Sequence, residues 1–138
     1  MKKLLGLTLA AILLVSCSDD DSSVNTENLV GKWFPTTTQI KGRPATPYEN
    51  DCATAKDNIE FDTNGTGTNV YYNTNCEDYT DDMTYAIIDK TLTINFGSGN
   101  VVSYKVTSLS SSKLVIEEGY DADNDGHYDT TSKIIFTK

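Results

Sequence analysis

The sequence is poor in the side chains on which most catalytic and metal centres depend. It contains one histidine, His127, and three cysteines among its 138 residues. A metal centre or a catalytic cysteine that needs neighbouring histidines therefore finds no support. The sequence also lacks Gly-x-Ser-x-Gly, His-Glu-x-x-His and phosphate-loop motifs, the common signatures of hydrolases, metalloproteases and nucleotide-binding proteins.

Basic residues are also few compared with acidic ones. The chain has 11 lysines and arginines against 20 aspartates and glutamates, which gives a net charge of −9. Phosphate backbones repel such a chain, so nucleic acid is excluded as a partner. Carboxylates are numerous enough to pair, which leaves glycoside hydrolysis open, but a barrel this small rarely holds a substrate cleft. We therefore predict a binding protein and not an enzyme.

Long apolar runs are limited to one, from Leu4 to Val15. It follows a short basic leader and is too short to span a bilayer, so residues 1–16 are predicted to be a removable signal peptide. The run ends Leu-Val-Ser-Cys at Cys17, which resembles the lipobox of bacterial lipoproteins. This resemblance implies that Cys17 is lipid-modified and anchors the protein to a membrane. An ordinary secretory cleavage site would leave Cys17 as an unpaired, exposed thiol.

Residues 17–28 are polar and carry Asp19-Asp20-Asp21 just after the cysteine. Their composition predicts a solvated tether between the lipid anchor and the folded domain. The acidic run resembles the export signal of surface lipoproteins in some gram-negative bacteria, which implies an outer-membrane lipoprotein displayed at the cell surface. The alternative is a plain acidic linker, with the domain on the periplasmic face.

Helix-forming residues become sparse after residue 20, whereas Thr, Val and Tyr are frequent, a composition typical of β-strands. Short β-rich segments alternate with turn residues such as Asn64-Gly65. Residues 44–56 are expected to form a loop with at most one helical turn. Strands are predicted at residues 31–40, 58–62, 66–74, 83–88, 91–96, 101–109, 113–120 and 130–137.

Most of these segments are joined by too few residues for crossover helices, so sequence neighbours are expected to pair antiparallel. Apolar side chains alternate with polar ones at Leu92, Ile94 and Phe96, which gives the strand one buried face. The fold predicted for residues 29–138 is all-β: an antiparallel meander of about eight strands in a small closed or nearly closed barrel. A two-sheet sandwich is the alternative.

An ordered set of short motifs between residues 29 and 118 resembles the lipocalin-like domain of bacterial surface lipoproteins. The set comprises Gly31-Lys32-Trp33, Asp51-Cys52, Lys56-Asp57, residues 61–66, Cys76, residues 91–94, Tyr104-Lys105-Val106 and Leu114-Val115-Ile116. The chain departs from the family at Thr84-Tyr85-Ala86, where many relatives carry a tryptophan, and in an acidic loop near the C-terminus. The resemblance implies a small lipocalin-like barrel that binds an apolar ligand, and it leaves the ligand unidentified.

Two cysteines remain once Cys17 is assigned to the anchor. An even pair in an exported domain most simply forms a disulfide, so a bond between Cys52 and Cys76 is predicted. It would tie the loop before the second predicted strand to the loop after the third.

Residues 121–129 fit the pattern D-x-D-x-D-G-x-x-D. Ca²⁺ prefers several hard oxygen ligands, and alternate aspartates place carboxylates on one side of a loop that Gly126 allows to turn sharply. The pattern resembles calcium loops held between two strands in integrin-type propellers. An acidic hairpin turn without an ion is the alternative. The candidate ligands are Asp121, Asp123, Asp125, Asp129 and the backbone carbonyl of His127.

The function predicted from these features is that of a lipid-anchored extracytoplasmic protein that binds a small apolar or amphipathic ligand or serves as an accessory surface module. A glycan- or protein-binding surface module without an internal pocket is the alternative. Adjacent strand residues point to opposite faces, so either Tyr71 or Tyr72 should be exposed. A glycan-binding surface would begin at that exposed ring.

The anchoring prediction is tested by Cys17→Ser. The variant should leave the membrane fraction, because the acyl chains have no other attachment point. The measurement is fractionation of the natural host, with Cys52→Ser as a control that removes a different cysteine. Unchanged membrane association of Cys17→Ser would contradict the lipoprotein interpretation.

Overall fold

The computed structural model describes residues 24–138. The predicted signal peptide 1–16, Cys17 and the acidic run at residues 19–21 lie outside these residues. Within 24–138 no helix is long and apolar enough to cross a membrane. The folded part begins upstream of the predicted boundary at Leu29, since Val24 packs against the core and a short 3-10 turn, η1, spans Thr26–Asn28.

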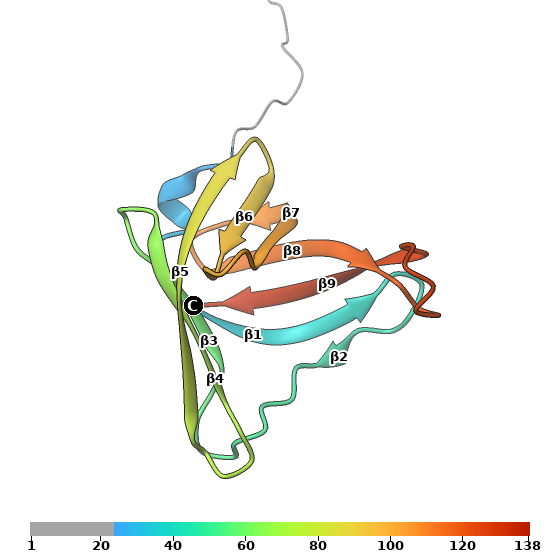
Figure 1. The fold of residues 1–138 in the computed structure, drawn as a ribbon, viewed down its shortest axis with the longest axis horizontal. Helices are drawn as coiled ribbons and strands as arrows, with labels where there is room; N and C mark the ends of the chain where they lie inside the picture. The colour runs from blue at the N-terminus through green and yellow to red at the C-terminus, as the bar shows by residue number, and fades with distance from the viewer. Residues whose placement is uncertain (1–23) are drawn as a thin grey trace, which may run out of the picture.

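All other regular elements are strands (Figure 1). They are β1 (Gly31–Ile40), β2 (Thr46–Pro47), β3 (Asn58–Phe61), β4 (Thr66–Tyr72), β5 (Asp78–Ile88), β6 (Thr91–Asn95), β7 (Val101–Leu109), β8 (Lys113–Tyr120) and β9 (Thr130–Thr137). The order along the sheet follows the sequence from β3 to β9, which is a meander.

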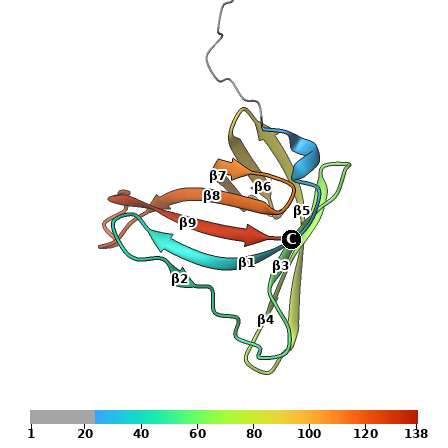
Figure 2. The ribbon, with the colours of Figure 1, turned by 180° about the vertical axis from the view of Figure 1, so that it is seen from behind.

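The meander closes on itself through β1. Gly31–Trp33 pair with β3, while the segment from Phe34 to Ile40 pairs with β9, and both pairings are antiparallel. Strands β1 and β3 to β9 therefore form a closed eight-strand barrel, whose curved wall is visible from both sides in Figures 1 and 2. This closure confirms the predicted barrel and excludes the sandwich. The two-residue strand β2 pairs with β1 outside the barrel.

Strand β5 differs from the prediction, which places residues 75–82 in a loop. It begins at Asp78 and not at Met83, because residues 78–82 pair with residues 68–72 of β4. The side chains of Asp78 to Asp82 are exposed and mostly acidic or polar, so they lack the apolar alternation that identifies a strand in a sequence. The short strand β2 lies in a segment predicted as loop, and no helical turn forms in residues 44–56.

The core lies inside the barrel, and segments from both ends of the described chain contact it. Trp33 is fully buried, and its Nε1–H donates to the Leu29 carbonyl at 2.7 Å. Lys138 Nζ lies 4.6 Å from the centre of the Trp33 ring and donates to the carbonyls of Asn28 (3.0 Å) and Val30 (2.6 Å). The last residue thus holds the first segment of the domain against the barrel.

The predicted disulfide between Cys52 and Cys76 is present. It joins the β2–β3 loop, defined here as residues 48–57, to the connection between β4 and β5. Cys52 is 2% exposed, so the bond is covered by the surrounding chain on that side. The disulfide thereby fixes the middle of a long loop beside the end of β4.

Replacing Cys52 and Cys76 together with Ala should lower the free energy of unfolding by about 3 kcal/mol, because the crosslink closes a chain segment of 24 residues in the unfolded state. Denaturant unfolding of the oxidised wild type and the double variant measures the difference. Reductant should destabilise the wild type and leave the variant unchanged. Equal unfolding midpoints for the two oxidised proteins would show that the bond adds no stability.

Candidate functional site

The barrel encloses a cavity of about 460 Å³, a volume typical of small-molecule sites. Every barrel strand except β5 contributes to its wall, together with the β2–β3 loop. The lining residues are Pro35, Tyr48, Asp51, Asp57, Asn58, Ile59, Phe61, Asn69, Val70, Tyr71, Tyr72, Leu92, Ile94, Phe96, Tyr104, Leu114, Ile116, Ile134 and Phe136.

Most of this wall is apolar. Leu92, Ile94 and Leu114 are 1% exposed and lie on the inward faces of β6 and β8. Phe96 also lines the cavity, so all three residues of the predicted apolar face at residues 92–96 point the same way. A water molecule against these side chains would find no hydrogen-bond partner, and an apolar ligand group would replace it with a gain in free energy.

The charged part of the wall comes from the β2–β3 loop. The Tyr48 hydroxyl donates to Asp57 Oδ2 at 2.6 Å, and the backbone N–H of Tyr72 donates to Asp57 Oδ1 at 2.9 Å. Asp57 therefore links the loop to β4. Burial, followed by the hydrogen bond to Asp57, raises the pKa of Tyr48 above its usual value, so this hydroxyl remains protonated and continues to donate.

Asp51 and Asn58 also contribute oxygen acceptors to the wall. Asp51 is exposed, and the ion pairs formed within residues 24–138 join Lys32 to Glu60 and Lys133 to Glu117 instead. Asn58 is 8% exposed; its Nδ2 donates to the Lys56 carbonyl at 3.2 Å, while its Oδ1 is buried without a partner. No lysine, arginine or histidine is among the lining residues.

The sequence alone does not identify the residues that line the cavity, and the structure shows why. The alternation along β6 indicates which side chains point inward, but not whether they leave a space between them. The charged residues of the wall, Asp51 and Asp57, lie outside the predicted strands. The position of the segment that carries them depends on the disulfide and on the Asp57 hydrogen bonds, which connect residues far apart in sequence.

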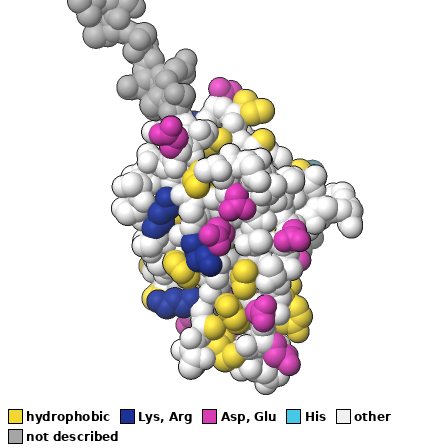
Figure 3. Space-filling view, turned by 90° about the vertical axis from the view of Figure 1, so that its left-hand side faces the viewer, with side chains coloured by type: hydrophobic (Ala, Val, Ile, Leu, Met, Phe, Trp, Pro, Cys, Tyr) yellow, Lys and Arg dark blue, Asp and Glu magenta, His cyan; other side chains and the backbone are white. Residues whose placement is uncertain are grey.

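An exposed aromatic pair lies at the edge of this wall. The rings of Tyr71 and Tyr79 are stacked, with centroids 5.3 Å apart and planes at 10°. Tyr71 is 43% exposed and Tyr79 47% exposed, whereas Tyr72 is half-buried. The prediction that one of the two adjacent tyrosines is exposed is confirmed, and Tyr71 also lines the cavity. On the face of the molecule drawn in Figure 3, hydrophobic side chains gather at the lower end, with carboxylates beside them.

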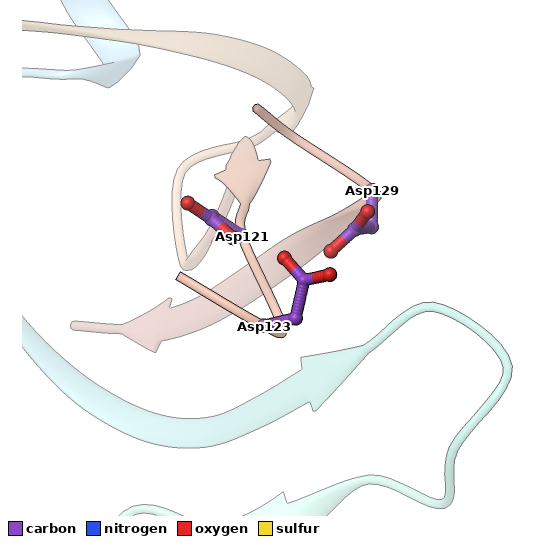
Figure 4. A group of neighbouring side chains, drawn as sticks. All are labelled: Asp121, Asp123 and Asp129. Carbon is purple, nitrogen blue, oxygen red and sulfur yellow. The ribbon is translucent and has the colours of Figure 1, made fainter. Parts of the chain in front are cut away.

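The acidic loop between β8 and β9 brings three of its four aspartates together. Carboxylate oxygens of Asp121, Asp123 and Asp129 lie within 4.8 Å of one another, and the side chains converge in Figure 4. The Gly126 N–H donates to Asp121 Oδ2 at 2.8 Å. This backbone hydrogen bond is the main cause of the lowered pKa of Asp121. These three exposed carboxylates could hold a metal ion.

Asp125 lies outside this group of three carboxylates, and the predicted role of the His127 backbone carbonyl stays a prediction. The Asp125 carboxylate accepts the backbone N–H of His127 at 2.8 Å, which stabilises the turn. Gly126 has a φ of 91°, a conformation that favours glycine, as the pattern implies. Tyr128 packs over Gly119, where a Cβ would come within 2.4 Å of the tyrosine ring.

Comparison with known proteins agrees with the barrel. Residues 29–116 match the family model described as a lipocalin-like domain. Among solved structures, a lipocalin-like protein from Bacteroides uniformis is 17% identical, with a TM-score of 0.59 over 80% of this chain and 98% of its own. An uncharacterized protein from Bacteroides eggerthii is 16% identical, with a TM-score of 0.55 over 79% of this chain and 98% of its own.

Apocrustacyanin C1 is 12% identical, with a TM-score of 0.54 over 88% of this chain and 69% of its own. At these identities the solved structures establish the fold alone. A search of curated proteins finds no match. The family model covers most of the barrel, from Leu29 into the first half of β8, and the chain therefore belongs to the lipocalin-like domain family.

Proposed function

We propose that this protein is a non-enzymatic, lipid-anchored binding protein that holds a small apolar or amphipathic ligand in the barrel cavity. The cavity is the observation that carries the proposal: about 460 Å³ of space, with a mostly apolar wall and two carboxylates from the β2–β3 loop. Burying apolar ligand surface against such a wall gives about 25 cal/mol per Å², and the polar groups orient the ligand.

The anchor and the location belong to the same proposal. Cys17 with its lipobox-like context supports acylation, and the following acidic run supports display at the outer surface of the outer membrane. The periplasmic face is the alternative location. In either place an amphipathic ligand of the membrane or of its surroundings would be close to the cavity.

A second candidate function is binding of a glycan or protein on the outside of the barrel. The stacked, exposed rings of Tyr71 and Tyr79 favour it, since sugars pack on aromatic faces. The pair differs from a simple surface patch because Tyr71 also contributes to the cavity wall. Loss of glycan binding in Tyr79→Ala, with cavity binding unchanged, would support this second function.

We also propose that the acidic loop binds Ca²⁺. Three converging carboxylates supply hard oxygens, and without a cation they repel one another. The loop would then be a structural calcium site that stiffens the β8–β9 hairpin.

The cavity is tested with a fluorescent alkyl probe and two substitutions. Ile94→Trp places a larger side chain in the apolar wall, and Ile134→Trp does so at a less buried position on β9. At least one folded variant should lose saturable probe binding, whereas Ile88→Trp, at a site 71% exposed, should bind like the wild type. Overpacking costs about 1–3 kcal/mol, so folding is checked by circular dichroism. Full binding by all three folded variants would place the probe outside the cavity.

The calcium site is tested by thermal unfolding. With a dissociation constant on the order of 10⁻⁴ M, Ca²⁺ at about 1 mM should stabilise the fold by about 1.4 kcal/mol, which raises the melting temperature by about 5 °C. Mg²⁺ should do much less, because it demands a tighter octahedron. Asp123→Asn with Asp129→Asn should abolish the shift, and Asp89→Asn, elsewhere on the surface, should retain it. No shift in the wild type would leave an acidic turn without an ion.

A further inference from the structure

The charge of the cavity wall is of one sign. Its ionisable groups other than tyrosines are Asp51 and Asp57, and no basic side chain lines the cavity. The ion pairs formed within residues 24–138 involve neither aspartate. A ligand carboxylate or phosphate in this cavity would face two negative charges with no compensating cation, which is unfavourable in a partly desolvated site.

The hydrogen-bonding groups of the wall also favour a positively charged ligand. Asp57 accepts two hydrogen bonds, and the Tyr48 hydroxyl uses its proton on Asp57. The Asp51 carboxylate has free lone pairs, and Asn58 Oδ1 is a buried acceptor that no donor of the described chain reaches. Both charged groups of the wall and this buried oxygen are acceptors, so a ligand that donates hydrogen bonds or carries positive charge complements them.

Aromatic rings add a further attraction for a cation. Tyr48, Tyr71, Tyr72 and Tyr104 line the cavity together with three phenylalanines. Ring faces attract positive charge, by about 0.5–1 kcal/mol at exposed sites and more when the cation is desolvated. The raised pKa of Tyr48 is consistent with this field, because the charges of Asp57 and Asp51 add to the effect of burial.

We infer that the cavity selects an amphipathic organic cation, whose apolar body fills the barrel and whose ammonium group lies at the Asp51 and Asp57 side of the wall. This inference rests on the proposed function of the cavity and specifies the ligand class. Primary and quaternary ammonium ligands share the required charge and differ in their ability to donate hydrogen bonds.

The experiment compares four probes with the same tail: decylammonium, decyltrimethylammonium, decanol and decanoate. Calorimetry below the micelle-forming concentrations measures each affinity for the Cys17→Ser protein, which keeps the whole described barrel and lacks only the predicted acylation site. At least one cation should bind about tenfold more tightly than decanol, and decanoate should bind most weakly. Tighter binding of the primary ammonium would show that hydrogen-bond donation contributes beyond charge.

Asp51→Asn tests the source of the selectivity. The site is exposed, and the change keeps the side-chain shape, so the fold should be unaffected. Affinity for the preferred cation should fall about threefold with decanol unchanged, whereas Asp89→Asn, which removes a charge outside the cavity wall, should alter neither. Equal losses in the two variants would assign the effect to the overall negative charge and overturn the inference.

The probe series tests the preference for a cation separately from the proposed function of the cavity. Decanoate binding as tightly as the cations would overturn the cation inference and leave the ligand cavity standing. Failure of all four probes to bind the folded domain would overturn the proposed cavity function itself.

Discussion

The pairing of β1 with β9 is the constraint on which the rest of the structure depends. Without it both strands would be open edges, and the meander would be a curved sheet with an exposed apolar face. The register that begins at Phe34 and Thr137 closes this sheet. Closure turns the inner faces of distant strands toward one space, so that Pro35, Ile94 and Phe136 line the same cavity.

A closed barrel supplies an apolar space, but the β2–β3 loop determines its polarity. The Tyr48 N–H donates to the Thr36 carbonyl at 3.0 Å, the disulfide fixes Cys52 near Cys76, and Asp57 binds Tyr48 and the backbone of β4. These attachments hold the loop at its start, middle and end. The polar groups therefore need little reordering when a ligand binds, which lowers the entropic cost of binding.

The sequence predicts those parts of the molecule that are governed by local patterns. The turn at Asn64-Gly65, the alternation along β6 and the short connections lead to the meander, and cysteine parity leads to the disulfide. The first half of β5 is missed because the side chains of Asp78 to Asp82 are exposed and polar, and only their partners in β4 make them a strand. The lipid anchor at Cys17 stays a prediction.

Of the two candidate sites, the sequence predicts the one formed within a single loop and misses the one formed by residues far apart in sequence. The acidic pattern locates Asp121, Asp123 and Asp129 in one loop, because a turn of nine residues is a local structure. It does not foresee that the Asp125 carboxylate turns back to the His127 N–H. The polar wall of the cavity has no local signature, since Asp51 and Asp57 acquire their neighbours only when the barrel closes and Cys52 bonds to Cys76.

The two groups of carboxylates differ in their surroundings and therefore in the cations that they suit. Asp121, Asp123 and Asp129 place oxygens close enough to replace several waters of a metal ion at once. Asp51 and Asp57 belong to no such group of three in residues 24–138, and Asp57 already accepts two hydrogen bonds. A bare metal ion there would lose hydration without enough ligands to replace it. An amphipathic organic cation needs only one charged group near these carboxylates and carries its own apolar surface, which the adjoining aromatic and aliphatic wall can bury.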